Sequence, residues 1–244
     1  MRTKQKAMTV LAVLTAIATG SVMAKSLYVI ANINAGPTPI NTYDIQGPPN
    51  HLVYQATQGV PSFAGGAVGL AIDNSSAKLF VTYEGSNTIQ LLDATNFANL
   101  GTTTAPGSSN LAGIAVDQGR NKVYTVDRTT DNLFVYSFDS ITNTLTLDRG
   151  GSVDMQGVVT GGMGGAYGIA IDEVRGLMYV GDLTQQVKVY DLVDVNNLTV
   201  SPIPLFGVVD VSAAGQSVQG VAVDSLRNHL FTGNALTSVY GSDG

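Results

Sequence analysis

Polar side chains that could bind a ligand recur at one kind of position in this sequence of 244 residues, directly after a short apolar run. Carboxylate and amide oxygens are the ligands that Ca²⁺ prefers, so acids from several such positions could hold this ion if the fold brought them together. Because no dense ligand loop of the form Asp-x-Asp-x-Asn-Gly occurs, solvated turn residues are the favoured alternative. The residues concerned are Asn32, Glu84, Asp127, Arg128, Asp182 and Asn234, with Glu84, Asp127 and Asp182 as the candidate Ca²⁺ ligands.

Motifs for covalent or acid–base catalysis are absent from the sequence. The two histidines, His51 and His229, each lie inside a predicted strand without a nucleophile motif beside them. There is no Gly-x-Ser-x-Gly elbow, no His-Glu-x-x-His and no phosphate loop, since the Gly-rich segment 161–165 lacks the required Lys. The absence of cysteine excludes disulfides, zinc–thiolate sites and thiol catalysis. A hydrolase that gathers carboxylates around a cation stays open.

A repeat positions these residues. A run of the form Gly-x-Ala-x-Asp occurs four times, and each Asp is followed seven residues later by an aromatic residue. Copies spaced by roughly 45 to 55 residues, built from short apolar runs and turns, are typical of radial or stacked β architectures. The runs begin at Gly69, Gly113, Gly168 and Gly220, and the aromatic residues are Phe80, Tyr124, Tyr179 and Phe231.

Each full repeat predicts four strands, which in the cleanest copy cover residues 68–72, 78–83, 88–92 and 98–104. One such sheet cannot bury both of its apolar faces, so we expect the sheets to pack radially as the blades of an all-β, antiparallel β-propeller. The Gly and the small Ala suit the crowded inner end of strand one, and the aromatic residue fills the wedge between sheets.

The aspartate that ends each Gly-x-Ala-x-Asp run has a structural reading and a chemical one. An Asp that opens a turn can accept backbone N–H groups, and repeats multiply structural residues. We therefore expect it to fix the turn after strand one rather than to catalyse or to bind metal. It recurs as Asp73, Asp117, Asp172 and Asp224.

About five blades are represented, and the set is incomplete. The first unit begins with a match to strand two at residues 26–30, and the chain ends before another strand one. Because ring closure usually completes one blade with strands from both termini, we expect a fragment of a parent with about six or seven blades. The predicted blade units cover about residues 25–60, 61–108, 109–160, 161–212 and 213–244, the first and last being partial.

Residues 79–93, Leu-Phe-Val-Thr-Tyr-Glu-Gly-Ser-Asn-Thr-Ile-Gln-Leu-Leu-Asp, resemble the YVTN family of β-propeller repeats. That family's pattern is an aromatic-Val-Thr-Asn run, a Gly-Ser-Asn-Thr hairpin and an apolar strand ending in Asp; here Tyr83 replaces the Asn. The Gly-x-Ala-x-Asp runs are similar to the related NHL-type repeats. The resemblance covers most of residues 26–244 and implies the propeller fold. Because such families include adhesion-type proteins and lactonase-type enzymes, it implies no single activity.

The first 24 residues have the features of a secretory signal: a basic start, an apolar core at 7–18 and small residues before a predicted cut between Ala24 and Lys25. Cleavage would remove three basic residues and lower the formal net charge from −6 to −9. Such a charge repels nucleic acid and anionic lipid, and no later run is long enough to span a membrane. We expect a secreted, periplasmic or cell-surface protein that does not insert into the membrane after cleavage.

Two functions follow from these observations. The leading hypothesis is an exported, non-catalytic propeller that acts as a scaffold for binding protein or carbohydrate at the cell surface or matrix. The alternative is a cation-dependent, lactonase-like hydrolase or lyase on the same fold, with Glu84, Asp127 and Asp182 as Ca²⁺ ligands.

Overall fold

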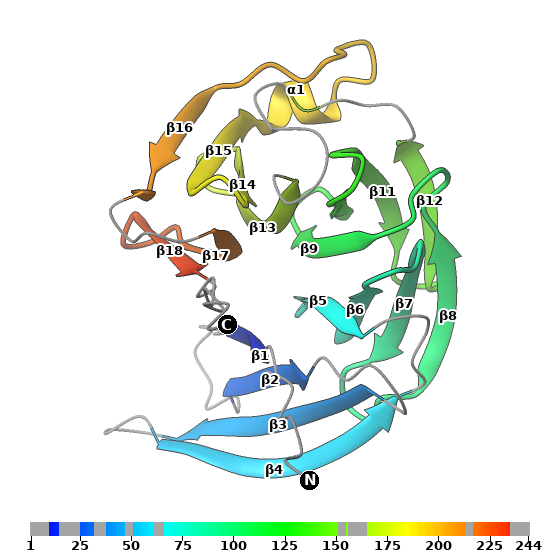
Figure 1. Cartoon of the computed structure of the whole chain (residues 1–244). Coiled ribbons are helices and arrows are strands. Elements are labelled where there is room, and N and C mark those ends of the chain that lie inside the picture. Colours follow the sequence, from blue (N-terminus) through cyan, green and yellow to red (C-terminus); the bar gives the residue numbers. More distant parts are fainter. Residues whose placement is uncertain are drawn as a thin grey trace, which may run out of the picture.

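The fold is built from antiparallel sheets that follow one another around an arc, with the first strand of each sheet nearest the centre (Figure 1). The computed structural model describes residues 10–14, 25–31, 38–46, 51–60, 66–150, 155, 165–212 and 217–234. Four of the sheets in this part have four strands, and the last has two. This arrangement is a β-propeller with four-stranded antiparallel blades, as the sequence predicts.

The five sheets are blades one to five in chain order. Blade one contains β1 (Val10–Leu14), β2 (Lys25–Ala31), β3 (Thr38–Gln46) and β4 (His51–Val60). Blade two contains β5 (Ala67–Asp73), β6 (Lys78–Tyr83), β7 (Thr88–Asp93) and β8 (Asn99–Thr104). Blade three contains β9 (Leu111–Asp117), β10 (Lys122–Asp127), β11 (Leu133–Asp139) and β12 (Thr144–Arg149). Blade four contains β13 (Ala166–Asp172), β14 (Leu177–Asp182), β15 (Gln186–Asp191) and β16 (Gly207–Asp210), with α1 (Leu192–Asn196) before β16, and blade five contains β17 (Val218–Asp224) and β18 (His229–Asn234).

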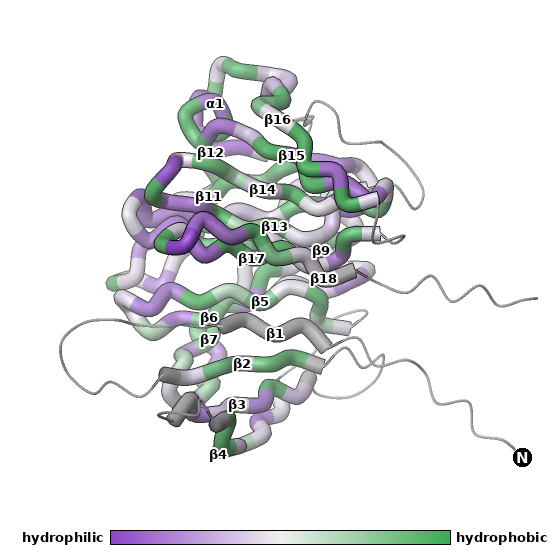
Figure 2. Tube along the Cα trace, turned by 90° about the vertical axis from the view of Figure 1, so that its left-hand side faces the viewer, coloured by the Kyte–Doolittle hydropathy of each residue, from purple (hydrophilic) through white to green (hydrophobic). Residues whose placement is uncertain are grey.

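The hydrophobic core lies between the blades, because alternate residues of each strand face opposite neighbours. One cluster joins blades one and two, a second joins blades two and three, and a third joins blades three and four. In the second cluster Phe80 of β6 meets Phe138 of β11 edge to face, with ring centroids 4.9 Å apart. Apolar residues lie along the strands and hydrophilic residues gather in the turns (Figure 2). Each blade therefore depends on its neighbours for burial.

The repeated glycine allows the first strands of neighbouring blades to approach closely. A Cβ atom added to Gly69 would lie 2.5 Å from the backbone oxygen of Ala112, and one added to Gly113 would lie 2.4 Å from that of Tyr167. Any side chain at these positions would force the blades apart. The prediction that glycine serves a crowded inner strand is confirmed for Gly69, Gly113 and Gly168, and it does not hold for Gly220, whose nearest described atoms lie 3.8 Å or more from an added Cβ.

The prediction that the aromatic residue of strand two is buried between sheets is confirmed for only some of the blades. Phe80 and Tyr124 are fully buried, and Tyr179 is partly buried. The prediction is wrong for Phe231, which is 55% exposed on β18. A wedge residue is buried by the blade that follows it, and no sheet follows blade five in the part of the chain that the structure describes.

Blade one has a strand that the sequence did not predict. Residues 10–14, within the expected signal segment, form β1 and pair with β2, with Val10 opposite Ala31 and Leu14 opposite Leu27. An apolar run that includes two valines suits the open edge of β2, where the backbone groups otherwise lack strand partners. The expectation that the first unit lacks strand one is therefore wrong for the chain with residues 1–24 attached.

Blade four contains the other unexpected element, the short helix α1. Asp191 caps its N-terminus by accepting from the Val193 N–H at 2.7 Å, and Leu192 and Val195 pack into the core. The predicted fourth strand near residues 205–211 is present as the shorter β16. Within the residues described here, the structure contains no helix long and apolar enough to cross a membrane.

Candidate functional site

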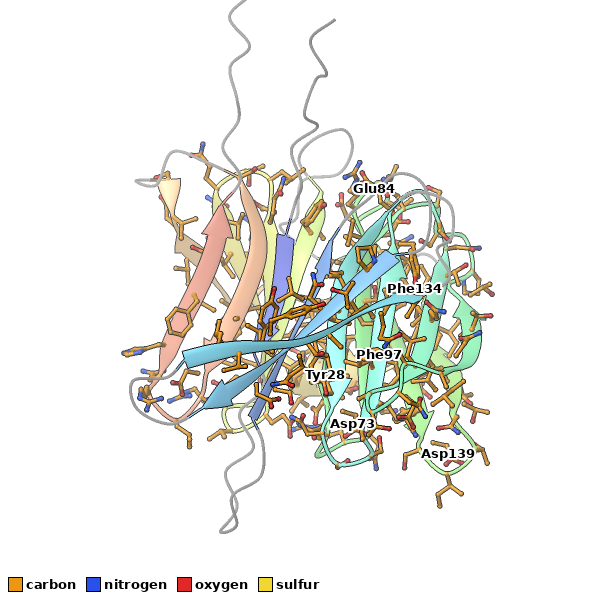
Figure 3. The ribbon with its side chains drawn as sticks, turned by 90° about the horizontal axis from the view of Figure 1, so that it is seen from below. Tyr28, Asp73, Glu84, Phe97, Phe134 and Asp139 are labelled. Carbon is orange, nitrogen blue, oxygen red and sulfur yellow. The ribbon has the colours of Figure 1, made fainter. Side chains whose placement is uncertain are left out.

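The hairpins between the second and third strands lie at one end of the propeller. Figure 3 places Glu84 at this end, while Asp73 and Asp139 lie at the opposite end. The sequence predicted six ligand-face residues here. Asn32 falls outside the described residues, and only the backbone of Asn234, at the end of β18, is described. The other four, Glu84, Asp127, Arg128 and Asp182, lie within the described residues.

Glu84 and Arg128 meet across the boundary between blades two and three. Arg128 Nη1 lies 2.6 Å from Glu84 Oε1, and each side chain keeps about a third of its surface exposed. The Arg128 guanidinium carbon also lies 5.8 Å from the ring centroid of Tyr167, on β13 of blade four. One guanidinium therefore joins three blades through an ion pair and a cation–π contact.

Asn110 braces the same place from the loop that connects blades two and three. Its Oδ1 accepts from the Gly85 N–H at 3.0 Å, and its Nδ2 donates to Thr129 Oγ1 at 3.2 Å. Its backbone oxygen accepts from the Arg128 N–H at 3.1 Å. Sequence reasoning missed Asn110 because its contacts come from hairpins far apart in the chain. The Arg128 surface is defined here as Glu84, Asn110, Arg128 and Tyr167.

The Arg128 surface offers a carboxylate, an amide, a guanidinium and a phenol. Burial raises the pKa of Tyr167, the charge of Glu84 raises it further, and Arg128 acts in the opposite direction. The phenol is therefore neutral at physiological pH. This mixture suits recognition through hydrogen bonds, charge and aromatic contact, and none of these four groups is a nucleophile beside a base.

Asp127 is not part of that surface. It is fully buried, and its Oδ2 accepts from Ser108 Oγ at 2.6 Å and from the N–H groups of Ser109 and Asn110, both at 2.9 Å. Its Oδ1 accepts from two N–H groups of its own hairpin. Burial alone would raise the pKa of Asp127, but these hydrogen bonds outweigh it, and the pKa lies below its ordinary value. Asp127 holds the inter-blade loop.

Asp182 has the same kind of role in blade four. It is fully buried, and its Oδ1 accepts from the N–H and Oγ1 of Thr184, at 2.8 and 2.5 Å. Lys188 Nζ lies 3.8 Å from the other oxygen. Asp127 and Asp182 both end strand two of their blades, a buried position, whereas Glu84 and Arg128 come one residue later.

The three proposed calcium ligands are thus engaged separately: Asp127 and Asp182 in their own turns, and Glu84 with Arg128. Among the residues that the structure describes, no group of three or more His, Cys, Asp or Glu side chains could hold a metal ion. Ca²⁺ binding by these residues stays a prediction.

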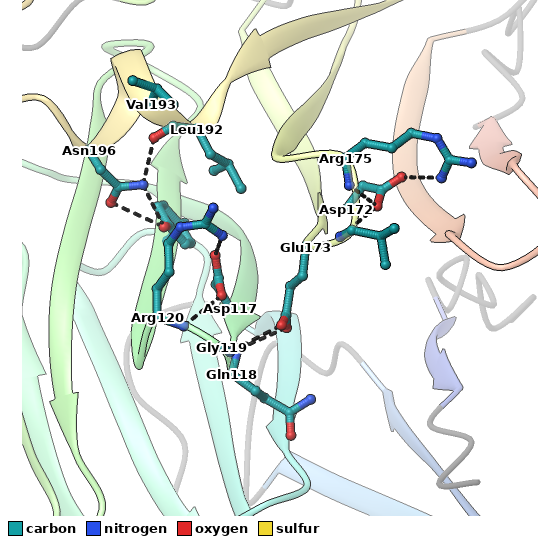
Figure 4. Close-up of polar contacts among 12 residues, drawn as sticks. Asp117, Gln118, Gly119, Arg120, Asp172, Glu173, Arg175, Leu192, Val193 and Asn196 are labelled. Atoms are coloured by element: carbon teal, nitrogen blue, oxygen red, sulfur yellow. Dashed lines mark hydrogen bonds and ion pairs between the residues drawn. The ribbon is translucent and has the colours of Figure 1, made fainter.

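The opposite end carries the turns between the first and second strands, and here the repeated aspartates have the predicted structural role. Asp172 Oδ1 accepts from the Val174 and Arg175 N–H groups, at 3.1 and 3.0 Å. An arginine three residues after the Asp pairs with its other oxygen (Figure 4). The pairs are Asp117–Arg120 at 2.7 Å, Asp172–Arg175 at 2.8 Å and Asp224–Arg227 at 2.7 Å.

These turns also join neighbouring blades. Glu173 of blade four accepts from the Gln118 N–H at 2.8 Å and the Gly119 N–H at 3.1 Å, both in blade three (Figure 4). Arg175 Nη1 donates to the Ser225 backbone oxygen of blade five at 2.9 Å. An arginine three residues after the repeated Asp occurs in three of the four copies, and it was the sequence signal for the Asp–Arg pair within each turn.

A second residue that sequence reasoning missed is Arg149, at the end of β12. It is 5% exposed, and its Nη1 donates to the backbone oxygens of Asp194, Val195 and Asn197 at the end of α1. Its Nε and Nη2 are buried without a hydrogen-bond partner, and burial lowers the pKa of the guanidinium. Arg149 fixes the C-terminal end of α1 to blade three.

Comparisons with known proteins give the fold alone. No family model and no curated protein sequence matches this chain, so the resemblance to YVTN and NHL-type repeats stays a prediction. Three solved structures each match 86% of this chain: a nidogen/laminin complex (16% identity, TM-score 0.55), a mitotic checkpoint complex (12%, 0.53) and Kuenenia stuttgartiensis hydrazine synthase (12%, 0.59). This chain spans 67%, 56% and 68% of their respective lengths. At such identities the likeness supports the β-propeller fold and no shared activity.

Proposed function

We propose that this chain is an exported, non-catalytic propeller that binds a protein partner through the Arg128 surface. The observation that carries the proposal is the Arg128 side chain, which keeps about a third of its surface exposed while its guanidinium contacts Glu84 and Tyr167 from two other blades. Arginine and tyrosine are enriched among residues that dominate protein–protein binding energy. Because the group is already fixed, less conformational entropy is lost when a partner binds.

The solved neighbours agree with a role in protein assembly. Two of them come from protein complexes, one of nidogen with laminin and one of the mitotic checkpoint. Their partners are their own, and only the general role is carried over to this chain. The formal net charge, −6 for the whole chain and −9 after the predicted cleavage, supports a neutral or basic partner and disfavours nucleic acid and anionic lipid. Carbohydrate is the competing class of ligand, and the same experiment distinguishes it.

The test is binding of the purified chain to arrays of extracellular proteins and of glycans. A binder found there is then measured against Arg128→Ala and against Arg120→Ala, a matched control that removes an ion-paired arginine at the opposite end. We expect Arg128→Ala to weaken protein binding by about tenfold or more, and Arg120→Ala to leave it unchanged. Equal binding by both variants would remove the Arg128 surface from the proposal, and binding to glycans alone would replace protein by carbohydrate.

A further inference from the structure

One face of blade five repeats the glycine-and-aromatic surface that blades two, three and four present to the blade that follows. Strand pairing sets Gly220 opposite Gly233, Ala222 opposite Phe231 and Asp224 opposite His229. Alternation along the strands places these residues on one side of the sheet. The blade-five face is defined here as Gly220, Ala222, Phe231 and Gly233.

The first of three shared features is the space above the glycine. In blade four a Cβ atom added to Gly168 would lie 2.9 Å from the Gln219 backbone oxygen of the next blade. A Cβ added to Gly220 would have its nearest atoms at 3.8 to 4.0 Å, and all of them belong to Gly233 in the same sheet. Among the residues that the structure describes, none fills the space over Gly220 that the next blade's first strand fills in blade four.

The second feature is the wedge residue. Phe80 and Tyr124 are fully buried against the blade that follows, whereas Phe231, at the same repeat position, is 55% exposed. Ala222, opposite Phe231, is also exposed, although Ala71 and Ala115 at the equivalent positions are buried. An aromatic and a small residue thus form an apolar face that has no partner in the described part of the chain.

The third feature is the arginine of the first turn. In blade four Arg175 pairs with Asp172 and also donates to the Ser225 backbone oxygen of the next blade. In blade five Arg227 pairs with Asp224, and its side chain is 74% exposed, against 34% for Arg175. Arg227 therefore has the same intrablade contact and room to donate to a further acceptor.

We propose that the blade-five face binds strand one of a further four-stranded sheet of the same repeat type. The strand's backbone lies over Gly220, its sheet covers Phe231, and a carbonyl of its first turn accepts from Arg227. A sheet is favoured over a helix or a small molecule because the close approach over the glycine occurs at three existing blade boundaries, and the arginine contact occurs at the boundary between blades four and five. Blade five lies at the end of the arc in Figure 1, where such a sheet would continue it.

The experiment supplies this sheet and asks whether Gly220 becomes crowded. A copy of residues 165–212, which form blade four, is joined after residue 244 through a Gly/Ser linker of about 20 residues, whose mean span is about 25 Å. Gly220→Ala is then introduced into the original and the extended chain, with Gly113→Ala in both as the matched control. Thermal melting and hydrogen exchange of β17 and β18 are measured for each protein.

In the original chain Gly220→Ala is expected to leave the melting temperature unchanged or slightly raised, because the space is open and Gly in a strand is entropically costly. In the extended chain it should lower the melting temperature by several degrees, as Gly113→Ala should do in both chains. Exchange in β17 and β18 should slow only when the added blade is present and Gly220 is intact.

Two results would overturn the proposal. One is the same small effect of Gly220→Ala in both chains, with no slower exchange in the extended one. The other is self-association of the original chain in sedimentation that Phe231→Lys abolishes and Leu226→Lys does not, which would assign the face to a second copy. Leu226 is a fair control because it is 90% exposed in the turn beside the face.

Discussion

In the hairpin between strands two and three, the last residue of strand two and the residue after it differ in burial and in their contacts. Asp127 and Asp182 end strand two, where the side chain is enclosed and turn N–H groups occupy its oxygens. Glu84 and Arg128 come one residue later and keep about a third of their surfaces exposed. A one-residue shift in the repeat thus separates residues that hold the fold from residues that can meet a partner.

The Asp127 carboxylate is expected to stabilise the fold above acid pH. Its folded-state pKa lies below the ordinary value of 3.8, so its contribution is complete above that value and is lost as pH falls through the lowered pKa. Asp127→Asn should cost about 3 kcal/mol at pH 7, because an amide cannot accept all the same hydrogen bonds, and should flatten the loss of stability in acid. Urea unfolding between pH 2 and 7 measures both effects.

Asp139→Asn is the control for Asp127→Asn. Asp139 accepts from the Ile141 and Thr142 N–H groups in an exposed hairpin, so its replacement should change stability much less. Equal losses in the two variants would contradict the assigned role of Asp127.

Calcium is expected to leave the stability of the protein unchanged. The oxygens of Asp127 and Asp182 already accept turn N–H groups, and Glu84 pairs with Arg128, so binding of Ca²⁺ would have to break these contacts. Thermal melting with added Ca²⁺ and with EDTA should give the same midpoint. A rise with Ca²⁺ that is lost in Glu84→Gln would instead support the cation-dependent hydrolase.

At the scale of elements, a blade is stabilised by the sheet that follows it. The wedge aromatic at one repeat position ranges from fully buried in blade two to 55% exposed in blade five, while the strand around it keeps the same pairing. Hydrogen bonds at the turns add a second link, as Glu173 and Arg175 reach from blade four to its two neighbours. Contacts between neighbouring blades, rather than contacts within one blade, therefore provide much of the stability of the fold.

Replacing the wedge phenylalanine by alanine should therefore lower the free energy of unfolding by different amounts in different blades. Phe80→Ala removes a fully buried ring and should destabilise the protein by about 3–5 kcal/mol. Phe231→Ala removes a ring that is more than half exposed and should change stability by no more than about 0.5 kcal/mol. Denaturant unfolding of the two variants beside the unmodified chain measures the difference. Similar costs would mean that the ring of Phe231 is covered in solution.

At the scale of the whole molecule, the innermost strand of blade one comes from the segment with secretory features. β1 pairs with β2 along five residue pairs, from Val10 opposite Ala31 to Leu14 opposite Leu27. Cleavage before Lys25 would remove this strand and leave the inner edge of β2 without it. Residues 10–14 can therefore either be removed with the signal segment or stay in place as the first strand of blade one, and one outcome excludes the other.

We expect the exported protein to begin at Lys25, as determined by N-terminal sequencing. The β2 amides that pair with β1 should then exchange faster than in the uncleaved chain, because their strand partner is gone. Ala24→Arg, which places a bulky charge at the cut, should retain residues 1–24 and the slower exchange. A mature protein that still begins at Met1 would contradict the signal prediction.

Much of the fold followed from local pattern. The spacing of Gly, Ala, Asp and aromatic residues predicted strands close to β5, β6, β9 and β10, and it assigned the repeated Asp to turns. The helix α1 could not be predicted in this way, since its five residues lack a helical period long enough to detect and its burial depends on blade three.

The sequence by itself determined the type of sheet and the order of its parts, because strand alternation and turn chemistry act over a few residues. Only the tertiary structure decided which polar groups face one another. Glu84, Arg128 and Tyr167 come together from three blades, and Asp127 is enclosed by the loop at 108–110. Burial and ion pairing depend on distances between segments far apart in the chain, and a repeat pattern carries no measure of those distances.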